Sequence, residues 1–144
     1  MKVVNVLTFV LVFLSFAILL GEAHGAVPLG VLELISIPVY FTTDGIIDDA
    51  GVSFIFLAFV GHILLVLSLM AKKKLLKTIC IIAGEIFILS TIIYFTKDYR
   101  QSATAKYTLG WSVPAIVNMI VLTTYLFLNK PKQAVVESNP VINK

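Results

Sequence analysis

Charged residues are scarce in this 144-residue chain: they make up 13% of it, whereas hydrophobic residues make up 59%. Soluble globular domains have about 25% charged and about 45–50% apolar residues. Too little polar surface remains to cover a water-soluble fold, so the composition excludes an ordinary soluble enzyme and a disordered tail, and it argues against a nucleic-acid-binding protein. The mean hydropathy of +1.01 instead predicts an integral membrane protein whose first partner is the lipid bilayer.

Cysteine is almost absent as well. The single cysteine, Cys80, lies inside an apolar run, so neither an intramolecular disulfide nor a metal site of the CxxC kind is possible. The chain also lacks a phosphate-binding loop, a nucleophile–base motif and a metal-ligand motif. We therefore expect no metal and no other cofactor, and we expect a protein that is not an enzyme.

What the chain does have is four long apolar runs. Each contains 18 residues or more, the length that a helix needs to cross ~30 Å of hydrocarbon at about 1.5 Å per residue. A segment exposed to lipid must satisfy its own backbone hydrogen bonds, so the runs are predicted to be helices. The runs cover residues 3–20, 52–70, 78–96 and 107–128. The predicted fold class is all-α, a four-helix transmembrane bundle over residues 1–130 with a mobile cytoplasmic tail at 131–144.

The lysines predict the orientation of these helices, because cytoplasmic loops carry an excess of Lys and Arg. Lys72, Lys73, Lys74 and Lys77 form a dense cluster between the second and third runs, and we expect this cluster at the membrane surface. The loop at 21–51 contains no Lys or Arg. We therefore place the lysine cluster and both termini in the cytoplasm and the loop at 21–51 outside the cell. The membrane is predicted to be the plasma membrane.

The first run has a second interpretation. Met1, Lys2, an apolar core and the stretch 21–26 resemble a secretory signal that would be cleaved after Ala23 or Gly25. The core of 18 residues exceeds the about 7–15 residues that are usual for such a signal, which favours a retained helix. Cleavage would leave three spans with the amino terminus outside.

The loop at 21–51 is not predicted to be plain coil. Residues 31–43 are rich in β-branched and aromatic side chains, and Asp44-Gly45 supplies a turn. Pro38 argues against a central strand. We expect one or two short strands that form a small extracellular cap, with an interfacial helix as the alternative.

Polar residues within the apolar runs are predicted to lie at one depth of the bilayer. His62 precedes the lysine cluster by about as many residues as Glu85 follows it, so an antiparallel helical hairpin brings the two side chains level. Counting residues from the lysine that flanks each run places Asn118 of the last run and Ser15 of the first run at this depth as well. These four residues form the predicted polar layer.

A charged side chain at the bilayer centre costs about 2.5–3.5 kcal/mol, and an interhelical hydrogen bond returns only about 0.6–2 kcal/mol. Glu85 is therefore expected either to be uncharged or to pair with a protonated His62. The layer could hold the helices in register, serve as a relay or ligand site, or contact a partner subunit. Gly61 and Gly84 adjoin the two ionisable residues and would let the helices pack closely.

Several short motifs occur in the last two runs: Ile82-Ala-Gly84, then Ile92-Ile-Tyr94, then a polar loop at 97–106, then Gly110-Trp111 near the start of the last run. This pattern resembles the second half of the claudin and peripheral-myelin or epithelial-membrane-protein tetraspans. The resemblance implies four helices, cytoplasmic termini and a structural role for Gly110 and Trp111. That family carries a Gly-Leu-Trp and a cysteine pair in its first outer loop. The loop here has neither Trp nor Cys, so no residue of it is carried over.

Small size, four spans and the lack of catalytic motifs favour a non-enzymatic tetraspan. Such a protein would organise the membrane or cell contacts, or serve as an accessory subunit of a larger channel, receptor or junction. Its expected partner is another membrane protein or a second copy of the chain, and not a nucleic acid. The alternative is a small oligomeric channel or transporter that uses His62, Glu85 and Asn118 as a polar path.

Overall fold

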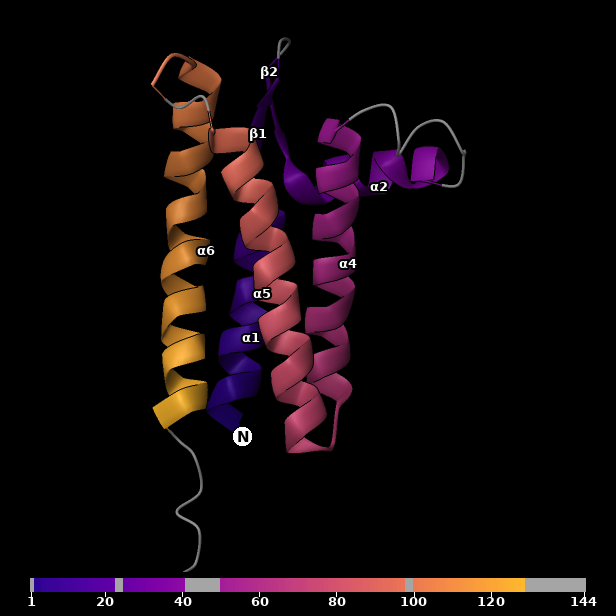
Figure 1. The fold of residues 1–144 in the computed structure, drawn as a ribbon, viewed down its shortest axis with the longest axis vertical. Coiled ribbons are helices and arrows are strands. Elements are labelled where there is room, and N and C mark those ends of the chain that lie inside the picture. Colours follow the sequence, from indigo (N-terminus) through magenta and orange to yellow (C-terminus); the bar gives the residue numbers. More distant parts are fainter. Residues whose placement is uncertain (1, 23–24, 41–49, 98–99, 129–144) are drawn as a thin grey trace, which may run out of the picture.

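The computed structural model of this chain describes residues 2–22, 25–40, 50–97 and 100–128. Four helices stand side by side, a two-stranded hairpin extends from one end of them, and a shorter helix crosses their side (Figure 1). In chain order the elements are α1 (Lys2–Phe16), β1 (Leu19–Glu22), β2 (Gly25–Pro28), α2 (Leu29–Tyr40), α4 (Ala50–Met70), α5 (Lys74–Thr96) and α6 (Ala103–Leu128). The predicted tail at 131–144 lies outside the described residues.

Three of these helices are long and apolar enough to cross a membrane: α4, α5 and α6, with 21, 23 and 26 residues. The predicted first span, 3–20, is wrong at its end, because α1 has 15 residues and stops at Phe16. Leu19 and Leu20 instead pair with Pro28 and Val27 in an antiparallel hairpin. The partner strand supplies the backbone hydrogen bonds that a further helical turn would otherwise have supplied.

The cap differs from the prediction in its secondary structure. Residues 31–40 form helix α2, so the strands predicted there are wrong and the alternative of a helix is confirmed; 41–45 lie outside the described residues. Leu29, Glu33 and Ile37 lie on the inner face of α2 at a spacing of four residues. Burial of this helical stripe outweighs the strand preference of the individual side chains.

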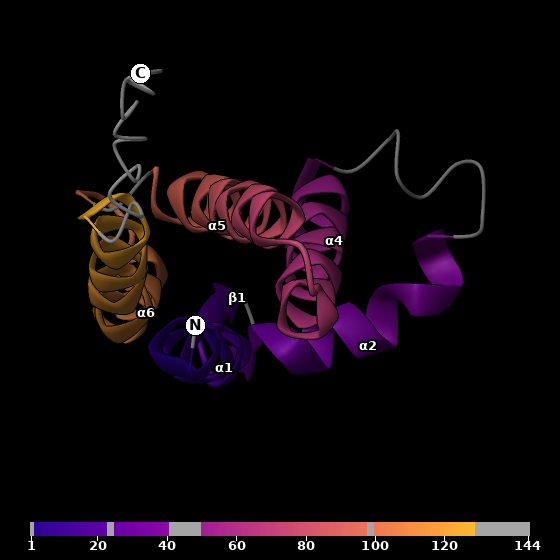
Figure 2. The same cartoon turned by 90° about the horizontal axis from the view of Figure 1, so that it is seen from below.

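α2 lies across the side of the bundle, at an angle to the long helices. Figure 2 shows α1 flanked by α6 on one side and α2 on the other, with α4 and α5 above it in this view. The core is made of buried aliphatic side chains from all these helices, including Leu11, Leu29, Leu65, Ile88 and Leu122. The outward faces of the bundle are apolar as well, which suits contact with hydrocarbon rather than with water.

α4 and α5 pack against each other through a pair of glycines. A Cβ atom added to Gly61 would lie 3.0 Å from the Gly84 carbonyl oxygen, and one added to Gly84 would lie 2.9 Å from the Gly61 carbonyl oxygen. Both glycines therefore occupy the helix contact at which the sequence places them. The residues that follow them, His62 and Glu85, lie at the same level of the bundle.

We expect Gly84→Ala to destabilise the fold by about 1–3 kcal/mol, because backbone atoms on both helices must move apart. Gly110→Ala is the matched control, since its Cβ would meet nothing within 4 Å. In a helix this control should be neutral or stabilising by about 0.5–1 kcal/mol. Unfolding of both variants in the same detergent measures the difference, and equal stabilities would show that the glycine contact does not determine helix packing.

Candidate functional site

Three polar side chains form a hydrogen-bonded chain in the interior, which we call the Ser15–His62–Glu33 chain. Ser15 Oγ lies 2.7 Å from His62 Nε2, and His62 Nδ1 lies 2.7 Å from Glu33 Oε1. The three residues come from the last turn of α1, the middle of α4 and the second turn of α2. Their exposed fractions are 0%, 3% and 1%, respectively. The imidazole therefore joins three separate elements in a place closed to solvent and lipid.

Local packing holds the imidazole ring in position. The ring of Phe16 lies against that of His62, with the ring centroids 4.2 Å apart. Gly30, at the start of α2, provides the space for Phe16, because a Cβ atom there would overlap the phenyl ring. Val4, Thr8, Leu11 and Ser15 share the buried stripe of α1, so the helical period alone turns the serine inward.

The proton positions follow from the limited number of donors. If Ser15 donates to His62 Nε2, then Nδ1–H donates to a charged Glu33, which leaves a net negative charge in an apolar interior. Ser15 Oγ also lies 2.7 Å from the Leu11 carbonyl oxygen. If Ser15 donates there instead, Nε2–H donates to Ser15 and one proton is shared between Nδ1 and Glu33. The second arrangement has no net charge, and burial favours it.

Two opposing effects act on the Glu33 carboxyl group. Burial raises the pKa of the Glu33 carboxyl above its ordinary value, whereas the hydrogen bond and the charge of His62 act in the opposite direction. The second oxygen, Oε2, has no hydrogen-bond partner among the described residues. The carboxyl group thus depends on His62 for its only hydrogen bond in that part of the chain.

The sequence did not predict Glu33 as a site residue. It lies in the segment that was expected to form an outer cap, and only the helical form of that segment brings it to His62. One signal was available: Glu33 is the single charged residue between Glu22 and Asp44, and it is surrounded by apolar side chains. An isolated acidic residue in an apolar segment is costly to bury, so it indicates a buried polar partner.

Glu85 belongs to a second cluster, between α5 and α6. Thr123 donates a hydrogen bond to Glu85 Oε2 at 2.5 Å. Glu85 Oε1 and Asn118 Oδ1 are buried and have no partner among the residues that the structure describes. His62 and Glu85 do not pair, because both ring nitrogens of His62 bind elsewhere. The predicted polar layer is therefore divided into two clusters that share a depth but not a hydrogen bond.

The lysine cluster is only partly a surface feature. Lys72, Lys73 and Lys74 are exposed, as a membrane-surface cluster requires. The surface position expected for Lys77 is wrong, because this side chain is 4% exposed and its Nζ donates to Asn5 Oδ1 at 2.6 Å. Lys77 lies in the first turn of α5, where it ties the start of α5 to the start of α1.

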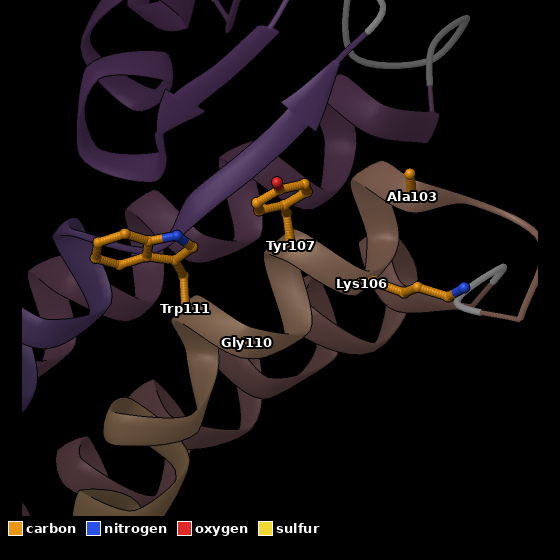
Figure 3. A pocket seen from close by; sticks show the side chains of 5 residues that line it. All are labelled: Ala103, Lys106, Tyr107, Gly110 and Trp111. Atoms are coloured by element: carbon orange, nitrogen blue, oxygen red, sulfur yellow. The ribbon is translucent and has the colours of Figure 1, made fainter.

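Gly110 and Trp111 lie on the outer surface of α6. They border a shallow hollow of about 550 Å³, which we call the α6 hollow; its other lining residues are Ala103, Lys106 and Tyr107. The rings of Tyr107 and Trp111 project from the same side of α6 (Figure 3) and are 67% and 52% exposed. Nothing lies within 4 Å of the Cβ position of Gly110, and the structural role expected for Gly110 and Trp111 stays a prediction.

Comparisons with known proteins add no further site. No family model, curated protein or solved structure matches this chain. The described residues contain no group of three or more His, Cys, Asp or Glu side chains that could hold a metal ion. The candidate sites therefore rest on the geometry of the chain alone: the Ser15–His62–Glu33 chain, the Glu85 cluster and the α6 hollow.

We expect the variants His62→Leu and Glu33→Leu each to destabilise the protein by about 3–5 kcal/mol, because each leaves a buried polar partner unpaired. The double variant should lose less than the sum of the two, since no unpaired partner remains. Ser15→Ala should cost about 0.5–1.5 kcal/mol, the value of one hydrogen bond. Reversible unfolding in detergent measures all four proteins, and additive losses would contradict the coupled chain.

Proposed function

We propose that this chain is an integral membrane protein that crosses the bilayer four times and has a small outer cap. The length and composition of α4, α5 and α6 support three of the crossings. α1 is about 22 Å long at 1.5 Å per residue, and the hairpin that follows it packs against α6. Non-helical backbone is tolerated at membrane depth where protein covers it, so α1 and β1 together supply the fourth crossing.

The positions of the helix ends support cytoplasmic termini. α1 begins, and α6 ends, at the end of the bundle where α4 gives way to α5 (Figure 1). That turn carries the exposed lysines Lys72, Lys73 and Lys74. Under the positive-inside rule this end faces the cytoplasm. The contacts of α1 with α4 and α6 favour a retained first helix over a cleaved signal.

We expect single cysteines at Lys2 and Lys73, in a Cys80→Ala background, to react with an impermeant maleimide in inside-out vesicles only. A cysteine at Gln101 should react in right-side-out vesicles only. All three positions are exposed, so accessibility within the protein does not differ between them. Absence of the Lys2→Cys peptide from the mature protein would show cleavage, and labelling of Lys73→Cys and Gln101→Cys from the same side would exclude this topology.

The function that the geometry favours is non-enzymatic. We infer an organiser of membrane contacts or an accessory subunit, in line with the resemblance to claudin-like tetraspans. The α6 hollow is the observation that carries this proposal. A small residue between two large aromatic side chains leaves room for a neighbouring helix to approach closely. The occupant would be a membrane-spanning helix of another protein or of a second copy.

An enzymatic role has less support, although serine, histidine and glutamate stand in the order of a hydrolase triad. Ser15 is fully buried, so no substrate reaches its hydroxyl group. Ser15 also lies in the last turn of α1, where the helix dipole is negative and disfavours a developing oxyanion. The shared proton of the neutral arrangement further removes the base that a nucleophilic serine needs.

A channel or transporter built on His62, Glu85 and Asn118 also has less support. His62 faces α1 and α2 through its hydrogen bonds, whereas Glu85 is bonded to α6. A proton path needs polar groups within hydrogen-bond reach of one another or joined by water. The separate partners of His62 and Glu85 break that path within a single chain.

We expect wild-type protein cross-linked in its native membrane to yield a defined complex, and Gly110→Leu to lose it at least several-fold. The leucine would occupy part of the α6 hollow, and its Cβ atom fits without a clash because nothing lies within 4 Å of that position. Val113→Leu is the matched control, since it enlarges an exposed α6 side chain outside the hollow. A wild-type chain that is recovered without partner or second copy would refute the proposal, as would an unaffected Gly110→Leu complex.

A further inference from the structure

The seam between α5 and α6 is open along much of its length. A hollow of about 410 Å³ is lined by side chains of both helices, among them Glu85, Leu89, Thr123 and Phe127. A second hollow of about 390 Å³ adjoins it at Phe127 and reaches Lys74. From Lys74 to Leu89 this α5–α6 groove is about 22 Å long, at 1.5 Å per residue. It is separate from the α6 hollow, which lies at the opposite end of α6.

The walls of the α5–α6 groove are almost entirely apolar, with Ile82, Ile86 and Ile120 around the Glu85 carboxyl group. Glu85 is 8% exposed, and its Oε1 has no hydrogen-bond partner among the described residues. An unpaired buried acceptor costs about 1–3 kcal/mol. Thr123 satisfies only the other oxygen. Glu85 thus lines the groove with a carboxyl group that has one oxygen unpaired, and a small rotation of this group toward the groove would bring that oxygen within reach of a ligand donor.

We infer that the α5–α6 groove binds an elongated apolar molecule that carries a hydroxyl group and reaches the groove from the bilayer. The hydroxyl group donates a hydrogen bond to Glu85 Oε1, and the hydrocarbon part lies against the isoleucine and phenylalanine side chains. A volume of about 410 Å³ is within the range of about 300–1,000 Å³ that is typical of small-molecule sites. A neutral donor fits better than an ammonium group, because a charge in these apolar surroundings is costly.

The test measures binding of radiolabelled 1-dodecanol to protein in nanodiscs, with empty nanodiscs subtracted. We expect Glu85→Leu to bind about ten-fold more weakly than the wild type, the effect of losing one hydrogen bond of about 1.4 kcal/mol. Glu85→Gln keeps a carbonyl acceptor and should bind nearly as well as wild type. Ser90→Ala is the matched control, because it removes a polar group of α5 that does not line the groove. Wild-type affinity in Glu85→Leu would overturn the inference.

Competition on the wild-type protein tests the same point without a variant that could fail to fold. Unlabelled 1-dodecanol should displace the radiolabelled alcohol, and dodecane should displace it at least several-fold less well. Equal displacement by the alkane would show a merely apolar groove and would also overturn the inference. Neither outcome depends on whether the chain assembles through the α6 hollow, so the two proposals fail separately.

Discussion

The fold depends on one side chain, the imidazole of His62. Its two ring nitrogens contact Ser15 on α1 and Glu33 on α2, each at 2.7 Å, while its own helix packs on α5 through the glycine pair. An apolar interior offers no water to replace these bonds, so a polar side chain there must find a protein partner. This requirement helps to place α2, because its amphiphilic stripe carries the Glu33 carboxyl group inward, where it meets the imidazole.

The two buried carboxyl groups, Glu33 and Glu85, lie on different sides of the bundle and have different surroundings. Glu33 and Glu85 each have one bonded and one unpaired oxygen, but Glu33 binds His62 in an enclosed place, whereas Glu85 binds Thr123 beside an open groove. Structural polar contacts tend to be fully satisfied because a half-satisfied network destabilises the fold. Neither carboxyl group is fully satisfied among the described residues, so the open groove beside Glu85, and not the number of its hydrogen bonds, distinguishes it from Glu33.

The sequence predicted what periodicity and composition determine: the three long helices, the close contact of Gly61 with Gly84, and the common depth of Ser15 and His62. It did not predict what long-range contacts determine. α1 ends early because a strand from the next segment pairs with Leu19 and Leu20. Lys77 is buried because Asn5, distant in sequence, accepts its hydrogen bond. Glu33 was missed because the side chains around it favour a strand, which would have turned it away from His62.

The α5–α6 groove and the α6 hollow both lie against α6. α1, α2, α4 and α5 are joined by close backbone packing and by bonded polar groups, so a change in any of them alters the fold itself. α6 packs on α1, α5 and β1, and it borders both the α5–α6 groove and the α6 hollow. α6 contributes Ala115, Met119 and Leu122 to the core and Thr123 to the hydrogen bond with Glu85, and it also carries an open site near each end. Ligand binding in the groove and assembly at the hollow would then be coupled only through the position of this one helix, since both sites draw their walls from it.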